Sequence, residues 1–278
     1  MPLPKISIVT PSFNQARFID TNIQSVLAQQ YPDIEHIIID GGSTDGTVEI
    51  LKKYSHLHWI SEKDNSQSDA LNKGFRRATG EIIGWLNSDD TYCPAVFHAI
   101  AEQFERKDVM VLCGDGYEID ERGEITHPLS SRSTDPDSLI RYWKWKYEFV
   151  QPSFFFRRNV FDEVGFLDES LYYAMDYDFF IRLGLRYRFG YTSKPLANLR
   201  MYPESKSGRN VQKIIPGYIL EMYKVSHRNW GKFLSARYCE YLFSFIGALF
   251  YSIIKNLFFS PTSKSRYLLK RKKNRMER

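Results

Sequence analysis

Residues 81–90 read EIIGWLNSDD, in which the apolar run 81–86 (EIIGWL) is followed by polar residues that end in two aspartates. Three similar runs precede it, each short, rich in apolar residues and followed by polar or turn residues: 5–10 (KISIVT), 36–40 (HIIID) and 57–61 (LHWIS). Amphipathic helical patterns separate the four runs, at residues 16–29, at 47–54 and up to about Ala78. Alternation of strands and helices at this spacing predicts a parallel sheet covered by helices, which is an α/β fold.

Two residues are expected to mark the beginning of helices. Thr47 has a side chain suited to capping the helix that runs to residue 54. Pro94 is expected to open the next helix at its first turn, where a missing backbone N–H costs nothing.

The second half of the chain has a different pattern. Residues 109–117 and 123–127 are predicted to form a longer strand pair, and the aromatic run 149–156 another strand. Helical patterns follow at 158–164 and 176–188. The last strand is expected at 196–202, and Phe154, Phe155 and Phe156 are expected in the core.

The composition is that of an ordinary globular protein. Of the 278 residues, 43% are hydrophobic, 26% charged and 15% aromatic, which excludes a disordered or fibrous chain. No linker, repeat or low-complexity segment interrupts the first 225 residues. We therefore expect one domain over 1–225, followed by a tail (226–278).

The cysteines and the N-terminus bear on the cell compartment. Cys93, Cys113 and Cys239 are too few and too scattered for a disulfide framework, and the six histidines do not cluster into a zinc site. The first residues lack the charged and apolar regions of a signal peptide. These features favour a protein of the reducing cytoplasm.

Positive charge is concentrated at the C-terminus. Residues 264–278 hold eight Lys or Arg and one Glu, whereas the other 263 residues carry 30 basic and 32 acidic groups. The nearly neutral body argues against a nucleic-acid-binding protein. The apolar segment 238–259 has an uncharged run of only 14 residues, 241–254, and a membrane span needs about 20.

We therefore expect region 238–278 to lie on an anionic membrane surface, at the inner face of the cell membrane. The alternatives are a helix that packs on its own domain, or one that packs on a second copy of the chain in a homodimer.

Polar residues follow the predicted strands at the edge where parallel α/β sheets bind ligands. They are Ser12, Asn14, Asp40, Glu62, Asp64, Asp89 and Asp90. Carboxylates gathered at one edge repel each other unless a cation is present, so the pattern predicts bound Mg²⁺ or Mn²⁺. The GxxxxGKS/T and GxGxxG patterns are absent after the first strand, which argues against P-loop and dinucleotide-binding enzymes.

Five segments together resemble the family 2 glycosyltransferases, and the resemblance covers roughly residues 4–207. In chain order they are 10–14 (TPSFN), 40–47 (DGGSTDGT), 61–64 with 69–74 (SEKD and DALNKG), 78–90 (ATGEIIGWLNSDD) and 174–178 (AMDYD). The resemblance implies a GT-A fold, which is a single Rossmann-like domain with a mostly parallel central sheet flanked by helices. It also implies an inverting, metal-dependent enzyme that uses a nucleotide-diphospho sugar, most often a UDP-sugar.

The resemblance implies a nucleotide-sugar-binding half over 1–110 and an acceptor half over 111–225, and it implies roles for residues of the first. Pro11 and Asp40 would line a uracil pocket, with Ser12 and Asn14 near the ribose and Asp64 near the base or ribose. The next helix would supply groups for the nucleotide, the sugar or the diphosphate: Asp69, Asn72 and Lys73.

The metal site would lie at residues 87–90. Asn87-Ser88-Asp89 stands where the family has its DxD motif, with Asn in the first acidic position. Asp89 is then the main metal ligand, and Asp90 lies beside it with a second role at the diphosphate.

The catalytic base is expected in the second half, since inversion needs a carboxylate that takes the acceptor proton. The family has a Glu-Asp pair at the start of a helix, and here the pair reads Met175-Asp176, so Asp176 is the candidate base. Its alternative role is an N-cap. Asp178 and Arg182 are one turn apart and could be a surface ion pair.

Two further groups would contact the substrates. Arg200 and Lys206 are candidate diphosphate ligands, in a segment where the family usually has His in place of Tyr202. An aromatic set could stack on a sugar or form a buried strand face: Trp143, Trp145 and Tyr147.

The expected function is transfer of a sugar to a saccharide or lipid-linked acceptor in cell-surface polysaccharide synthesis. A nucleotidyltransferase is a weaker alternative because the loop after the first strand is neither basic nor glycine-rich. A nucleotide-sugar-binding or scaffold protein without catalysis is the non-enzymatic alternative, for which Asn87 and Met175 are the evidence.

Overall fold

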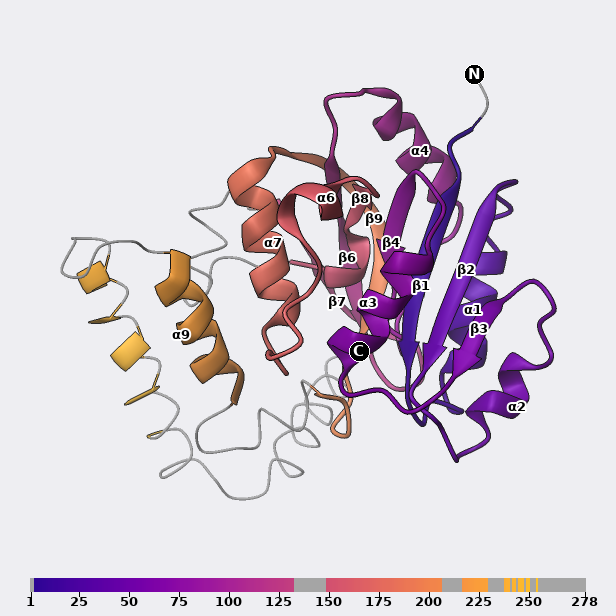
Figure 1. Ribbon diagram of the computed structural model, residues 1–278, viewed down its shortest axis with the longest axis horizontal. Helices are drawn as coiled ribbons and strands as arrows, with labels where there is room; N and C mark the ends of the chain where they lie inside the picture. Colours follow the sequence, from indigo (N-terminus) through magenta and orange to yellow (C-terminus); the bar gives the residue numbers. More distant parts are fainter. Residues whose placement is uncertain are drawn as a thin grey trace, which may run out of the picture.

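The computed structural model describes residues 3–132, 149–206, 217–229 and 238–240, and eight further positions between 242 and 254. The first half contains the predicted alternation of strands and helices (Figure 1). Its elements are β1 (Ile6–Ser12), α1 (Ile19–Leu27), β2 (Ile34–Asp40), α2 (Thr47–Leu51), β3 (His58–Ser61), α3 (Gln67–Arg77), β4 (Ile82–Trp85), β5 (Thr91–Tyr92) and α4 (Phe97–Glu105).

The second half adds strands of both directions and three α-helices to this framework. Its elements are β6 (Val111–Ile119), β7 (Ile125–Leu129), the 3₁₀ turn η2 (Gln151–Ser153), β8 (Phe155–Arg157), α6 (Val160–Val164), α7 (Met175–Arg186), β9 (Phe189–Arg200) and α9 (Gly217–Asn229). The predicted strand pair is confirmed, because β6 and β7 form an antiparallel hairpin.

The nine strands of the described residues belong to one sheet, in the order β3-β2-β1-β4-β8-β6-β9-β5, with β7 paired to β6. Strands β3, β2, β1 and β4 are parallel to one another. Strand β8 is antiparallel to both of its neighbours, whereas β6 and β9 are parallel. The sheet therefore combines a parallel half with a mixed half, and the predicted α/β class is confirmed.

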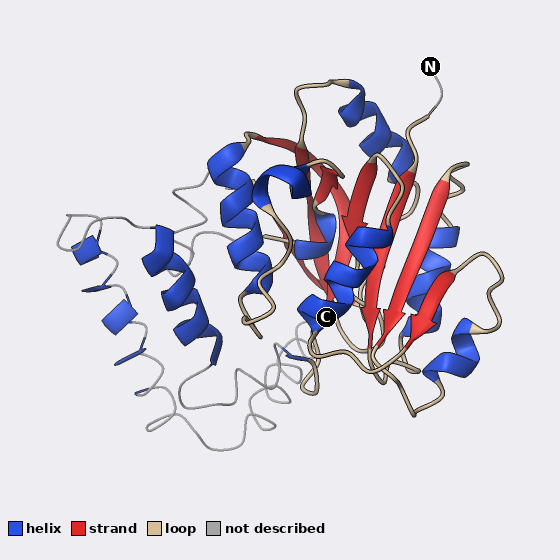
Figure 2. Ribbon diagram, viewed as in Figure 1, coloured by secondary structure: helices blue, strands red, loops and turns tan. Residues whose placement is uncertain are grey.

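Helices cover both faces of the sheet (Figure 2). Helices α3, α6 and α7 share one buried cluster with alternate residues of the strands, such as Val9 and Ile83, whereas α1 and α4 pack with Ile8 and Ile82 on the opposite face. The three phenylalanines before Arg157 alternate in the same way: Phe154 and Phe156 belong to the first face and Phe155 to the second, all three fully buried. Their predicted place in the core is confirmed.

Several predicted boundaries differ from the structure. Thr47 is the first helical residue of α2 and not its cap, and the Asp45 carboxylate accepts hydrogen bonds from the Thr47 N–H (3.1 Å) and hydroxyl (2.6 Å). Pro94 does not open α4, because Ala95 has a φ of +53° and the helix begins only at Phe97.

The aromatic run is also shorter as a strand than expected. Residues 151–153 form a 3₁₀ turn with Pro152 inside it, and a proline has no N–H for a strand ladder. Strand β9 in turn begins seven residues before its predicted start, since Phe189 already pairs with Val111 of β6.

Helix α9 crosses the boundary predicted at residue 225. It packs on α7, and its buried residues Val225 and Ser226 lie on either side of that boundary. None of the helices in the described part of the chain has the length and apolar character needed for a bilayer span. The candidate platform Trp143, Trp145 and Tyr147 and the basic tail 264–278 lie outside the described residues.

Candidate active site

The carboxyl ends of β1, β2 and β3 meet at one edge of the sheet, where the three arrows end together in Figure 1. Their last residues are in register: Ser12 pairs with Asp40, and Asp40 with Ser61. Most of the predicted polar residues follow this edge, so the structure brings together residues that are far apart in the sequence.

Asp40 is fully buried and accepts four hydrogen bonds from its own surroundings. The donors are the N–H groups of Gly42 (3.2 Å) and Ser43 (2.9 Å) and the hydroxyls of Ser43 (2.5 Å) and Ser61 (2.7 Å). A carboxylate has about four acceptor positions. Asp40 therefore holds the 41–43 loop in place, and because three of the bonds end on Oδ2, Oδ1 is the oxygen with an acceptor position left.

The loop after β1 is tied to the same region. The Asn14 side chain accepts from Thr44 N–H (2.9 Å), and its backbone N–H donates to the Ser43 hydroxyl (2.7 Å). Pro11 is buried in β1 opposite Ile39. The Ser12 hydroxyl is buried and has no hydrogen-bond partner in the described part of the chain.

Charged groups lie between β3 and α3. The Lys73 ammonium is 3.1 Å from Glu62 and 3.4 Å from Asp69, which raises its pKa. Burial, followed by the charge of Asp69, raises the pKa of Asp64, and Lys73 opposes this shift. The Asp64 carboxylate also fills the space that a side chain at Gly41 would need.

Asn72 has a structural role in this structure, which differs from the predicted contact with sugar or diphosphate. Its carboxamide accepts from Leu167 N–H (3.0 Å) and donates to Leu167 C=O (3.0 Å) and to Glu169 (2.8 Å). The side chain thereby joins α3 to the segment before α7.

Asn87, in the first position of the motif, forms four hydrogen bonds. Its oxygen accepts from Gln67 (2.9 Å) and Trp85 (2.9 Å), and its nitrogen donates to Gln151 (2.8 Å) and Asp90 (3.2 Å). An aspartate at this position could not donate. The departure from DxD is therefore explained by the neighbours of residue 87.

Asp89 and Asp90 are adjacent in sequence but have different surroundings. Asp89 accepts from the Tyr202 hydroxyl (3.1 Å), and burial raises its pKa against the effects of that bond and of Arg200. Asp90 is almost completely buried and accepts from Arg200 N–H (2.8 Å) and from Asn87. Burial and the Asp89 charge raise the pKa of Asp90 well above its ordinary value.

Asp90 is therefore directed into the protein, against the prediction that it is a metal and diphosphate ligand. Among the described residues, no group of three or more His, Cys, Asp or Glu side chains is arranged to hold a metal ion. The chain fits a Mg²⁺ or Mn²⁺ ion held by Asp89 together with substrate phosphates, since such ions often use only one or two protein carboxylates.

Arg200 also differs from its predicted role as a diphosphate ligand. Its guanidinium donates to the carbonyl oxygens of Asp89 (2.7 Å), Asp120 (2.8 Å) and Glu121 (3.2 Å), and burial lowers its pKa. These contacts use Nε and Nη1 of the guanidinium and fix the backbone of Asp89.

Lys206 extends from the loop after β9 to the start of α3. Its ammonium donates to Gln67 (2.8 Å) and lies 4.4 Å from the centre of the Tyr172 ring. Burial lowers its pKa to about 8, against the opposing effects of Asp176 and Glu221. Because Gln67 also bonds to Asn87, one hydrogen-bonded chain runs from the motif at β4 to Lys206.

Asp176 is the second residue of α7 and is not its N-cap, a position occupied by Ala174. One carboxylate oxygen accepts from Tyr177 N–H (2.7 Å). Burial and the Glu221 charge raise the pKa of Asp176, whereas Lys206 lowers it. A carboxylate at this place could act as a general base.

The Met175 side chain explains the loss of the first acidic residue of the pair. It is buried, and its sulfur accepts a hydrogen bond from the Ser68 hydroxyl on α3 (2.9 Å). A carboxylate there would be placed in the core beneath α7, where burial of a charge is costly.

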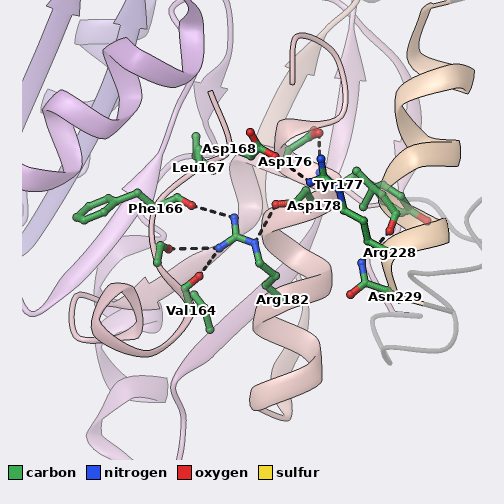
Figure 3. Close-up of polar contacts among 12 residues, drawn as sticks. Val164, Phe166, Leu167, Asp168, Asp176, Tyr177, Asp178, Arg182, Arg228 and Asn229 are labelled. Atoms are coloured by element: carbon green, nitrogen blue, oxygen red, sulfur yellow. Dashed lines mark hydrogen bonds and ion pairs between the residues drawn. The ribbon is translucent and has the colours of Figure 1, made fainter. Parts of the chain in front are cut away.

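Asp178 and Arg182 are an ion pair, as the i,i+4 spacing predicts, but Asp178 is buried and the pair is not on the surface (Figure 3). The Arg182 guanidinium lies 2.8 Å from Asp178 and also bonds to the carbonyl oxygens of Val164 and Phe166. The pair fixes the segment that leads toward α7 and so has a structural role.

Three residues of this region were missed in the sequence analysis: Gln67, Gln151 and Glu221. Each acts through a contact between elements distant in the sequence, and each lies outside the family segments. The only sequence signal is the Gln-Pro-Ser stretch that contains Gln151.

The comparisons with solved structures agree with a glycosyltransferase fold of the GT-A type. A structure of S. aureus TarS in complex with UDP superposes with a TM-score of 0.65 at 18% identity, over 94% of this chain and 77% of that one. A mannosyltransferase of Pyrobaculum calidifontis, in complex with GDP-Man and Mn²⁺, has a TM-score of 0.62 at 14% identity, over 99% and 81%. The predicted GT-A fold is confirmed.

The chain belongs to glycosyl transferase family 2, whose model matches residues 7–165. An uncharacterized glycosyltransferase of Rickettsia typhi is 33% identical over 199 residues, 64% of this chain and 58% of that relative. The putative teichuronic acid biosynthesis glycosyltransferase TuaG of Bacillus subtilis is 39% identical over 94 residues, 32% of this chain and 37% of TuaG. The chain thus matches only part of the length of these relatives.

Proposed function

We propose that the protein transfers a sugar, with inversion, from a nucleotide-diphospho sugar to a hydroxyl of a saccharide or lipid-linked acceptor in polysaccharide synthesis. The observation that carries this proposal is the hydrogen-bonded chain Asn87–Gln67–Lys206, which connects the Asp89 motif with the surroundings of Asp176. A candidate donor site and a candidate base therefore belong to one site.

The nucleotide would bind at the carboxyl edge of β1–β3. The unpartnered Ser12 hydroxyl and the Asp64 carboxyl are the groups we assign to the base and ribose, next to the loop that Asn14 and Asp40 shape. Lys73 adds positive charge beside them. The uridine assignment rests on the family resemblance, and the TarS complex with UDP supports it.

In the proposed reaction, an acceptor oxygen attacks the anomeric carbon of the donor and its proton passes to the Asp176 carboxylate. The bond between the anomeric carbon and the diphosphate oxygen breaks, and its electron pair leaves with the nucleoside diphosphate. Stabilising this leaving charge is the main electrostatic task. A bound divalent metal would supply positive charge there, and Asp89 is the residue that would hold it.

Lys206 is the side chain we assign to the leaving diphosphate. An ammonium has three N–H donors, and Gln67 takes one of them. Lys206 also interacts electrostatically with Asp176. Its positive charge could therefore act both on the candidate base and on the leaving diphosphate.

The departures from the family pattern do not favour an inactive protein. Asn87 and Met175 each have a structural explanation in their neighbours, while Asp89 and Asp176 are retained. A non-enzymatic scaffold therefore has no specific observation in its favour.

The experiment is a panel of UDP-, GDP- and TDP-sugars, tested for donor binding by thermal shift with and without Mn²⁺, then for transfer and donor hydrolysis. We expect one donor to bind more tightly with Mn²⁺, and Asp89→Ala to abolish both the metal dependence and turnover in a folded protein. Equal donor affinity of the variant and the wild type, with and without Mn²⁺, contradicts the metal assignment.

We also propose that the C-terminal region binds an anionic membrane surface. Five apolar side chains with exposed fractions of 36–76% lie on the described positions of this region: Leu242, Phe243, Ile246, Phe250 and Ile254. Four of them recur at every fourth residue, so they share one helical face. An apolar face followed in sequence by a strongly basic tail is typical of helices that lie in the membrane interface.

A further inference from the structure

Helix α9 contributes one carboxylate to three consecutive backbone amides just before α7. Glu221 Oε1 accepts from Tyr172 N–H (3.1 Å), and Oε2 accepts from Tyr173 N–H (2.6 Å) and Ala174 N–H (2.9 Å). Bonds from N–H groups to an ionised carboxylate are stronger than neutral ones. Glu221 therefore fixes the backbone of three residues that end two positions before Asp176.

These amides lie at the N-terminal end of α7, which has no side-chain cap of its own. Its N-cap is Ala174, which has no side chain able to accept a hydrogen bond. The first N–H groups of a helix, starting with that of the N-cap, have no partner within the helix, and its N-terminus carries partial positive charge. Glu221 supplies from another helix a negative oxygen for the Ala174 N–H and for the two amides before it.

Two further contacts hold α9 against the same segment. The hydroxyls of Tyr177 and Ser226 are 2.9 Å apart and buried, and Arg228 lies 2.9 Å from Asp168 (Figure 3). Figure 3 shows Arg228 extending from α9 toward the segment that precedes α7. Helix α9 thus contacts the 168–177 segment at three places along its length: at Asp168, at residues 172–174 and at Tyr177.

We propose that Glu221 is a positioning residue for Asp176, so that α9 belongs to the framework of the active site. It fixes the junction from which the candidate base projects toward the acceptor. This inference rests on the proposed function, in which Asp176 takes the acceptor proton.

The charged groups that face Asp176 give a second readout. They are Lys206, from the loop after β9, and Glu221. Glu221 raises the pKa of Asp176 and Lys206 lowers it, so removal of Glu221 lowers the pKa. The acid limb of the kcat profile, on which Asp176 loses its proton, then moves to lower pH.

The test compares Glu221→Ala, Glu221→Gln and Arg228→Ala in the full-length protein. In the Ala variant kcat falls on the order of 10²-fold, as for a catalytic group displaced by about 1 Å, while the Kd of the donor is unchanged and the acid limb moves to lower pH. The Gln variant regains part of kcat, because its remaining oxygen can accept from Tyr173 and Ala174. Arg228→Ala is the matched control, since it loses a contact of α9 with the same segment but leaves the amides bound.

Hydrogen exchange provides a measurement that does not require activity. The Tyr173 and Ala174 amides exchange faster in Glu221→Ala and remain protected in Arg228→Ala. Unchanged kcat and exchange in a folded Glu221→Ala variant overturn the inference, as does an equal loss of kcat in Arg228→Ala. If the wild type neither transfers nor hydrolyses any donor, the proposed function fails. The exchange data still decide whether Glu221 binds the amides just before α7.

Discussion

Asn87→Asp would restore the acidic residue that the DxD motif has in this position, and we expect it to destabilise the protein. The substitution replaces the amide nitrogen, which donates to Gln151 and Asp90, by an oxygen that can only accept. It leaves the Gln151 side-chain oxygen without its donor. It also places a carboxylate oxygen about where the nitrogen now lies, 3.2 Å from Asp90 Oδ2.

The magnitude follows from these contacts. Two unit charges 3.2 Å apart repel by about 5 kcal/mol at an effective dielectric constant of about 20. Each lost hydrogen bond adds about 1 kcal/mol. The total destabilisation is limited because the introduced carboxyl can take up a proton and so lose its charge. We expect a loss of about 4–6 kcal/mol in the free energy of unfolding at pH 8, which corresponds to a fall in Tm of about 10–20 °C for a domain of this size.

The pH dependence identifies the cause. The introduced carboxyl has a pKa raised above its unfolded value of about 3.9, so it destabilises the folded protein at pH values above its folded pKa. The part of the deficit that is due to charge therefore shrinks as the pH falls through the folded pKa and disappears below the unfolded one, whereas the part due to the lost hydrogen bonds remains. Urea unfolding of the wild type and the variant between pH 5 and 8 measures this difference.

Asn87→Ala is the control, because it removes all four hydrogen bonds without adding a charge. Its deficit should depend on pH much less than that of the Asp variant, because its only effect on a titrating group is the loss of the hydrogen bond to Asp90. An Asp variant as stable as the wild type at pH 8, or one whose deficit is the same at pH 5, would refute the proposed role of Asn87.

Three further predictions concern chemistry and location. Asp176→Asn should lower kcat by about 10²–10⁴-fold while donor Kd, measured by calorimetry, stays unchanged; near-normal turnover would exclude it as the base. Donor affinity should fall as the pH rises through about 8, where Lys206 loses its proton, and Lys206→Arg should flatten that profile; a flat wild-type profile contradicts the diphosphate role. Deleting 236–278 should abolish sedimentation with anionic vesicles and spare transfer to a soluble acceptor. Vesicle binding that survives the deletion, or that the wild type lacks, contradicts membrane association by this region. If the deletion instead converts a dimer to a monomer, the region is a subunit contact.

The sequence predicted the parallel half of the sheet because each of its strands is a short buried run followed by polar residues. β1 and β4 lie within one or two residues of their expected positions. The second half was predicted less well, since Pro152 and the early pairing of Phe189 depend on neighbours in the sheet that local patterns do not contain.

The site could be predicted as a set of positions but not as a network. Asp89 and Asp176 are assigned from motif spacing and family resemblance, and their roles as metal ligand and base stay predictions. Asp90 and Arg200 were assigned to ligands because a sequence gives the charge of a side chain and its place in a motif, but not the direction in which the side chain points. Their direction into the protein is fixed by a contact between residues 110 positions apart.

The shared sheet restricts how this protein can move. Strand β8 of the second half lies between β4 and β6, and β5 of the first half pairs with β9 of the second. A hinge rotation of one half against the other would break both ladders. The protein therefore cannot open and close as two lobes around its substrates, and conformational change during turnover must be confined to connecting segments at the edge of a rigid sheet, such as the one that carries Tyr202 and Lys206.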